Sequence, residues 1–145
     1  VESVFGKALA IYGNHVRVVS TAGEDGVRVS GHAVAYHVVM FPVKPDNEIA
    51  LPDLSNIIGR MRHQFQPGQS VPGWACISPL GLIERSAHEL VQLTDRSEWA
   101  SVALPYVGCG AGERSWETEV EPMLSAILDD RFVVIQFQSP RAKRI

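Results

Sequence analysis

Apolar residues recur along the chain with two different periods, which predict amphipathic helices alternating with strands. Leu54, Ile57, Ile58, Met61 and Phe65 fall on one face of a helix. The run 33–43 is continuously apolar and rich in β-branched residues, which is typical of a strand buried on both faces of a parallel sheet. The pattern predicts helices at 5–12, 54–65, from 79 onward and at 116–129, and strands at 15–21, 33–43, 100–107 and 131–137.

This order of elements predicts one α/β domain spanning residues 1–145. We expect a three-layer αβα architecture, with a mixed, mostly parallel sheet flanked by helices. Segment 45–79 is punctuated by proline and glycine, so we expect it to be an insertion or a lid. Asp53 or Ser55 is the expected N-cap of the helix at 54–65, and Ser78, followed by Pro79, that of the next helix.

Composition narrows the class of protein. A chain of 145 residues with 46% hydrophobic and 20% charged residues suits one globular domain. The net charge of −3 gives no sign of general nucleic-acid binding, and no apolar run is long enough for a membrane helix. Cys76 and Cys109 form no CxxC pair and have no histidine at metal-ligand spacing, so neither a metal site nor a disulfide framework is expected. We expect a cytoplasmic protein that requires no cofactor.

The segment 101–116 carries the strongest functional signal. An apolar strand leads into a loop with glycine at Gly108, Gly110 and Gly112, and a helical stretch begins at Trp116. Glycines let backbone N–H groups turn toward an anion, and a helix N-terminus adds positive potential. The pattern predicts a phosphate-binding loop, and a tight turn without a ligand is the alternative. A nucleophilic role for Cys109 is a weaker alternative, because no histidine is tied to it by spacing.

Several segments, taken in order, resemble the macro domain, an α/β fold that binds ADP-ribose, and in particular its bacterial and phage branch. They cover about residues 33–135. The matching segments are Phe41–Lys44 (FPVK), Leu82–Ala87 (LIERSA), Val102–Pro105 (VALP), Gly108–Gly112 (GCGAG), Trp116 and Asp129–Val134 (DDRFVV).

The resemblance implies roles for particular residues. Lys44 matches the lysine that is catalytic in the branch that removes ADP-ribose from macromolecules, where an amine can attack the anomeric carbon through a Schiff base. Glu113 is the nearest substitute for the acidic loop residue of related enzymes, and an ordinary surface charge is the alternative. Phe137 can stack on a base, and core packing is the alternative. The implied ligand-binding residues are Gly108, Cys109, Gly110, Ala111, Gly112, Glu113 and Phe137.

The chain also departs from the macro pattern. The strand and the adenine-binding aspartate loop that normally open the fold are not found before Phe5. The chain is therefore expected to be either an N-terminally shortened relative or a piece of a larger protein. Its sheet would lose central strands and expose an edge, which homo-oligomer formation can cover. The first hypothesis is a module that binds ADP-ribose or a related nucleotide, with possible hydrolysis of ADP-ribosyl bonds. The alternative is a non-catalytic oligomeric remnant without a nucleotide pocket.

The remaining aromatic and histidine side chains are expected to be structural. Trp74 and Trp99 are expected to fill gaps around helix ends, and Trp116 to dock its helix against the sheet. His37 lies in an apolar run and is expected to be a core histidine with satisfied hydrogen bonds.

Overall fold

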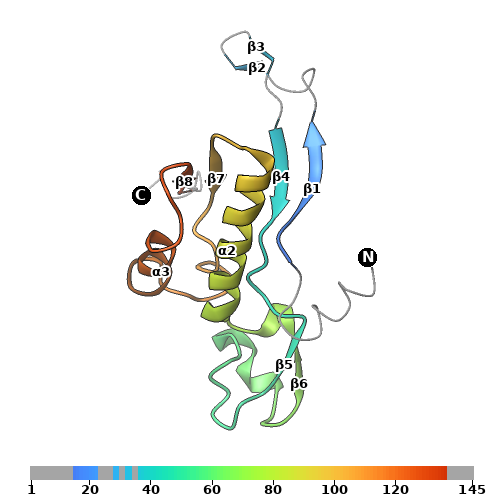
Figure 1. Ribbon diagram of the computed structural model, residues 1–145. Helices are drawn as coiled ribbons and strands as arrows, with labels where there is room; N and C mark the ends of the chain where they lie inside the picture. Colours follow the sequence, from blue (N-terminus) through green and yellow to red (C-terminus); the bar gives the residue numbers. More distant parts are fainter. Residues whose placement is uncertain (1–14, 23–27, 30–31, 34–35, 137–145) are drawn as a thin grey trace, which may run out of the picture.

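The computed structural model describes residues 15–22, 28–29, 32–33 and 36–136 (Figure 1). The helix expected at 5–12 and the candidate residue Phe137 lie outside the described residues. The strands are β1 (Arg17–Ala22), β2 (Arg28–Val29), β3 (His32–Ala33), β4 (Tyr36–Met40), β5 (Asn47–Ile49), β6 (Ser70–Pro72), β7 (Val102–Leu104) and β8 (Phe132–Val134). The helical elements are η1 (Gly59–Gln64), η2 (Gly73–Ala75), α2 (Leu80–Ser97), η3 (Trp116–Val120) and α3 (Glu121–Ser125).

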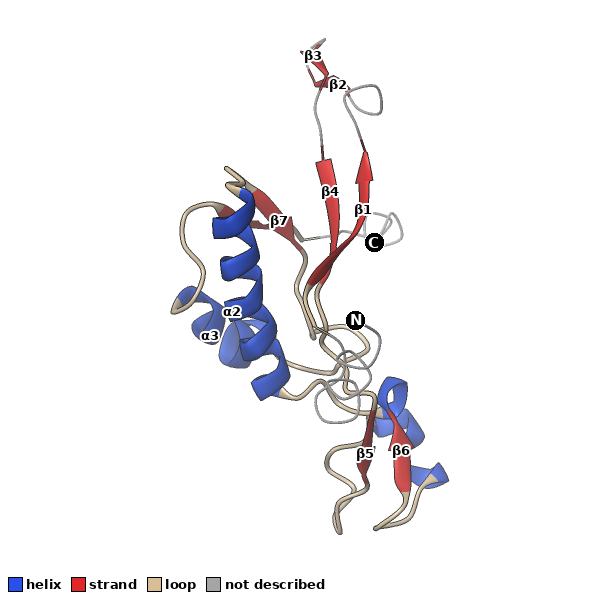
Figure 2. Cartoon of the chain, turned by 45° about the vertical axis from the view of Figure 1, so that its right-hand side comes forward, coloured by secondary structure: helices blue, strands red, loops and turns tan. Residues whose placement is uncertain are grey.

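Helices and small sheets alternate along the chain, as in the general α/β class. Within the described ranges the strands form four two-stranded sheets: β1 with β4, β2 with β3, β5 with β6, and β7 with β8. The pairing of β7 with β8 is parallel, with Val102 opposite Phe132, and the other three pairs are antiparallel. Figure 2 shows the β1–β4 ribbon toward one end of the molecule and the β5–β6 pair at the other, with α2 to one side.

The strand expected to be buried on both faces is instead largely exposed. The side chains of Tyr36 and Val38 on β4 are exposed, and Val38 keeps 47% of its accessible surface. His37 is also exposed, so it is not the core histidine that its apolar neighbours suggested. Its ring stacks on Trp99 at 5.1 Å and its Nδ1 hydrogen-bonds with the Thr21 hydroxyl at 2.9 Å. A ribbon of two strands cannot supply the covering layer that a continuous apolar run usually has.

The main core lies between α2, the parallel strands and α3. Its apolar residues on α2 recur three and four positions apart, so a single face of the helix supplies the contacts. The helix begins with Pro79 at the N-cap position, and the Ser78 side chain caps nothing among the described residues. Glu98, with φ of 55°, ends it. The buried members of this core are Ile83, Ala87, Leu104, Val107, Val120 and Leu124.

Segment 45–79 has a second hydrophobic core of its own. The helix predicted at 54–65 is wrong, because only η1 is helical and Ile57 forms an antiparallel bridge with Cys76. Leu54 has φ of 60°, and Asp53 accepts the N–H of Ser55 at 3.0 Å, so Asp53 closes a turn rather than capping a helix. The buried members of this second core are Ala50, Ile57, Val71, Ala75 and Cys76.

The helix predicted at 116–129 is shorter and less regular. η3 is a π-helical turn capped by Ser115, whose hydroxyl accepts the N–H of Thr118 at 3.3 Å, and α3 ends at Ser125. Trp116 packs against the main core and stacks on Tyr106 with a centroid separation of 4.3 Å. Trp116 therefore docks its helix, as predicted. In the described part of the chain, no helix is long and apolar enough to cross a membrane.

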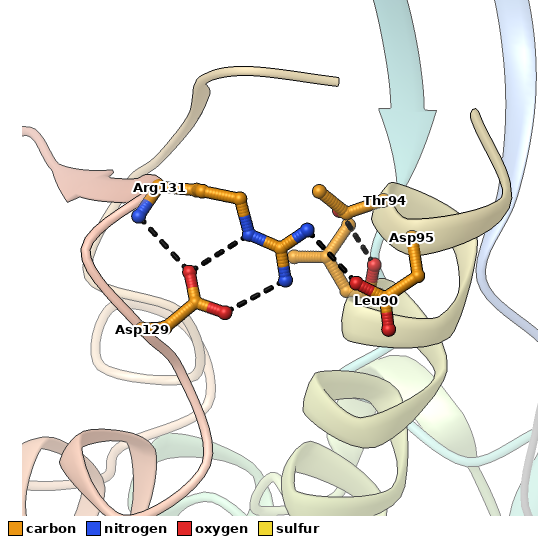
Figure 3. Close-up of polar contacts among 5 residues, drawn as sticks. All are labelled: Leu90, Thr94, Asp95, Asp129 and Arg131. Carbon is orange, nitrogen blue, oxygen red and sulfur yellow. Dashed lines mark hydrogen bonds and ion pairs between the residues drawn. The ribbon is translucent and has the colours of Figure 1, made fainter. Parts of the chain in front are cut away.

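Arg131 connects the start of β8 to the C-terminal end of α2 (Figure 3). Its Nε and Nη2 donate to the two carboxylate oxygens of Asp129 at 2.9 and 2.7 Å. Its Nη1 lies 2.8 Å from the carboxylate of Asp95 on α2. The Arg131 hydrogen bonds lower the pKa of Asp129 from 3.8 to about 2. The stability gained from this carboxylate is therefore fully present above pH 3.8 and is lost as the pH falls toward 2.

We expect Asp129→Asn to be less stable than the wild type at pH 7, and the difference to shrink as the pH falls from about 4 to 2. Urea midpoints measured at several pH values test this. Asp130→Asn is the matched control, because Asp130 is an exposed neighbour that makes no ion pair with the described residues. A stability difference that does not change with pH would contradict the assignment.

Candidate functional site

Lys44 joins three separated segments of the chain at one point. Its Nζ donates to the main-chain carbonyl of Ala111 at 2.9 Å, to that of Trp74 at 3.3 Å and to that of Cys76. The two strongest candidates of the sequence, Lys44 and the glycine loop 108–112, are therefore in contact. The third segment, around η2, was not connected to either of them by any motif.

The backbone around Lys44 is fixed on two sides. On one side, the Pro42 carbonyl accepts the Ser86 hydroxyl of α2 at 2.7 Å. On the other side, Gly73 packs so closely on Pro45 that a Cβ at Gly73 would overlap the Pro45 carbonyl. The Gly73 N–H also donates to the main-chain carbonyl of Asp46 at 2.9 Å. The backbone on both sides of Lys44 therefore helps to hold its ammonium group in place for the three hydrogen bonds that it donates.

The glycine loop owes its shape to two glycines, for different reasons. Gly108 has φ of 75° and lies against Ile83 of α2, whose Cδ1 would be 2.5 Å from an added Cβ. At Gly112 an added Cβ would overlap the Ser78 hydroxyl and stand 2.5 Å from the Gly108 carbonyl oxygen. At Gly110 an added Cβ would meet no described atom within 4 Å. Packing therefore requires the first and third glycines but leaves Gly110 open to solvent.

Internal hydrogen bonds use some of the loop's N–H groups and leave others. Those of Cys109, Glu113 and Arg114 donate to carbonyls within the segment 106–110 at 3.0–3.3 Å. Within the described residues, the N–H groups of Gly110 and Ala111 have no acceptor, and both residues are exposed. Two adjacent, exposed and unused N–H donors can bind an anion. The candidate anion site is thus the turn Gly110–Ala111, which is smaller than the whole loop suggested by the sequence.

The environment of Lys44 favours a positioning role. Burial lowers the pKa of Lys44 below 10.5; the charges of Cys76 and Glu113 oppose this effect, and Arg60 adds to it. Its three acceptors are all carbonyl oxygens, which pair with N–H and not with a free lone pair. These contacts favour the ammonium form, so nucleophilic attack would first require the amine to leave them. Catalysis by Lys44 stays a prediction.

Glu113 connects the glycine loop to segment 45–79, which carries the second hydrophobic core. With φ of 59°, it directs its carboxylate to the N–H of Gly59, at 2.9 and 3.3 Å, where η1 begins. Because both carboxylate oxygens lie within hydrogen-bond distance of this N–H, we interpret Glu113 as a second support of the loop. Arg114 supports it from the other side, since its Nε donates to the Ser78 carbonyl at 2.6 Å and its Nη1 to Glu119 at 3.0 Å. Both charged side chains thus have structural partners.

Both cysteines are held as thiols. The Cys109 Sγ–H donates to the Val107 carbonyl at 3.4 Å, and burial, followed by the charge of Glu119, raises its pKa above 9.0. Burial, followed by the charge of Glu48, raises the pKa of Cys76 to about 11. A nucleophilic role for Cys109 finds no support here, because a reactive cysteine needs a lowered pKa.

We expect one slow-reacting and one protected thiol in the native protein. Cys109 is half-buried and should react slowly with a thiol reagent at neutral pH, while fully buried Cys76 should react only after unfolding. The Cys76 thiol should also lose its contribution to stability as the pH rises from 9 toward 11, because its folded-state pKa lies above the unfolded value. Reaction progress followed with and without urea tests this, with Cys109→Ser identifying the reactive residue. Prompt reaction of both thiols without urea would refute it.

The structure adds residues that sequence analysis did not assign to the site. Trp74 is exposed rather than filling a gap, and its carbonyl accepts Lys44. Ser78 is fully buried against Gly112, and its hydroxyl has no partner among the described residues. Arg60 lies near enough to influence Lys44. These contacts join segments that are far apart in sequence, so no local motif could have revealed them.

No metal centre is found in the part of the chain that the structure describes, since no three His, Cys, Asp or Glu side chains group together there. Comparison of the chain with family models, curated proteins and solved structures gave no match. The resemblance to macro domains therefore depends on the sequence segments quoted above.

Proposed function

We propose that this protein binds the diphosphate of ADP-ribose or a related nucleotide at the turn Gly110–Ala111. The observation that carries the proposal is the pair of N–H groups of the exposed residues Gly110 and Ala111, which have no acceptor among the described residues. Lys44 and Glu113 hold the loop that carries them. Such a turn needs little reorganisation to receive phosphate oxygens, which lowers the entropic cost of binding.

The positive charge of Lys44 supports the same ligand class. The ammonium group lies 2.9 Å from the Ala111 carbonyl of the turn, and Arg60 adds a second cation in the vicinity. Two segments that resemble the macro domain, FPVK and GCGAG, lie 64 positions apart at Lys44 and Gly108 and meet through this lysine. We therefore keep a macro-like, three-layer architecture with a mixed, mostly parallel sheet as part of the proposal, together with a homo-oligomer that covers exposed strands such as β4.

Titration calorimetry with ADP-ribose and with inorganic pyrophosphate tests the proposal. We expect both to bind, and Gly110→Asp to weaken both at least about tenfold, because it places a carboxylate beside the anion without a steric clash. Gln92→Glu on the exposed face of α2 adds the same charge away from the loop and should leave both affinities unchanged. Absence of heat with either ligand at millimolar concentration would favour the remnant without a pocket.

A further inference from the structure

We infer that Trp74 is a stacking surface for the base of the bound nucleotide, which makes it a specificity-determining residue. The inference rests on the proposed function and extends it from the phosphates to the base. No motif led to Trp74, and the geometry of its turn points to this role.

The side chain of Trp74 is exposed, although the residues on either side of it in the turn are buried. Its side chain retains 58% of its accessible surface, whereas the flanking Gly73 and Ala75 are buried. Most exposed apolar side chains in this protein lie on strands or near the ends of the described segments. Trp74 differs because it belongs to the short helical turn η2, inside the segment that carries the second core.

The backbone of this turn cannot easily move. The N–H of Gly73 donates to Asp46 at 2.9 Å, and the N–H of Cys76 returns to the Gly73 carbonyl at 3.0 Å. Gly73 packs against Pro45 without room for a Cβ. The backbone that carries the indole is thus held in place, which lowers the entropic cost of ordering the ring against a ligand.

The same nitrogen atom connects Trp74 to the candidate anion site. Lys44 Nζ lies 3.3 Å from the Trp74 carbonyl and 2.9 Å from the Ala111 carbonyl. Both carbonyls therefore accept hydrogen bonds from the same ammonium group, which brings the backbones of Trp74 and Ala111 close together. The indole projects from this neighbouring backbone and is exposed, so we infer that it meets the base of a nucleotide whose phosphates occupy the turn at Ala111. A nucleobase is the planar group that such a ring binds best, since every base offers a π-face to an aromatic side chain.

Two probes and two substitutions test the inference. ADP-ribose carries a base, and inorganic pyrophosphate offers only the anion. Trp74→Ala should weaken ADP-ribose binding about 10- to 100-fold and leave pyrophosphate affinity within about twofold, since base stacking contributes on this scale. Trp74→Phe keeps a ring and should restore most of the ADP-ribose affinity. The Trp74 carbonyl, and so its bond to Lys44, is present in both variants, and thermal melts check that both are folded.

The outcomes separate the two proposals. If the wild type binds both probes and Trp74→Ala weakens neither, or weakens both equally, the stacking role is refuted and the anion site stands. If the wild type binds pyrophosphate but gains nothing from the base of ADP-ribose, the stacking role is refuted as well. If the wild type binds neither probe, the anion site is refuted and the stacking role with it.

Discussion

Gly112→Ala is expected to destabilise the protein by about 1–3 kcal/mol, the range typical of overpacking at a well-packed site. The added methyl would overlap the Ser78 hydroxyl and stand 2.5 Å from the Gly108 carbonyl oxygen. Neither neighbour moves freely, because the Ser78 N–H donates to the Gly112 carbonyl at 3.1 Å and the Gly108 carbonyl accepts the N–H of Arg114 at 3.0 Å. Urea unfolding followed by circular dichroism measures the loss.

Gly110→Ala is the matched control, because it makes the same chemical change two residues away. Its Cβ would meet no described atom within 4 Å, so we expect a change in stability below about 0.5 kcal/mol. Equal destabilisation by the two variants would mean that the loop does not have the packing described here. A stable Gly112→Ala variant would have the same meaning.

Lys44→Met is expected to cost about 1–2 kcal/mol, because it leaves the part-buried Cys76 carbonyl without its charged donor. The Trp74 and Ala111 carbonyls are exposed, so water can replace the lysine there. We also expect the amides of Gly110 and Ala111 to exchange faster with solvent, since the hydrogen bond from Lys44 to the Ala111 carbonyl is lost. Urea unfolding and hydrogen exchange give the two readouts.

The control for Lys44→Met separates hydrogen bonding from charge. Arg60→Met removes an exposed cation that acts on Lys44 through its charge but makes no hydrogen bond with a described residue. It should change stability by less than about 0.5 kcal/mol and leave exchange in the loop unaltered. If Lys44→Met is no more destabilising than Arg60→Met, the lysine is not the support of the loop.

The long amphipathic helix was the most predictable element of this fold. Its apolar residues repeat over several turns, and the structure buries most of them, with Ile83 and Ala87 in the main core. The sequence also predicted the parallel pairing of β7 and β8, because a helical segment lies between the two strands. The helix at 54–65 failed because the same apolar spacing can supply a compact core around a hairpin, and a turn at Asp53 and Leu54 interrupts the helix.

The candidate site was partly predictable. Lys44 and the glycine loop were singled out by residue type and order, and the structure brings them into contact. Which N–H groups remain available could not be predicted, because this depends on carbonyls within the loop competing for the same donors. The support from Gly59 and the exposed ring of Trp74 depended on how segment 45–79 folds against the rest of the chain.

Local chemistry determined that this chain has a long helix packed on parallel strands and a glycine loop able to turn its amides outward, because periodicity and backbone freedom are properties of neighbouring residues. Tertiary structure alone decided that Lys44 supports the loop through three carbonyls. It also decided that Gly112 is fixed by packing while Gly110 has free space, and that the Trp74 and Ala111 carbonyls share the Lys44 ammonium group. Each of these depends on segments distant in sequence sharing one small volume, where sterics and hydrogen-bond competition select the final geometry.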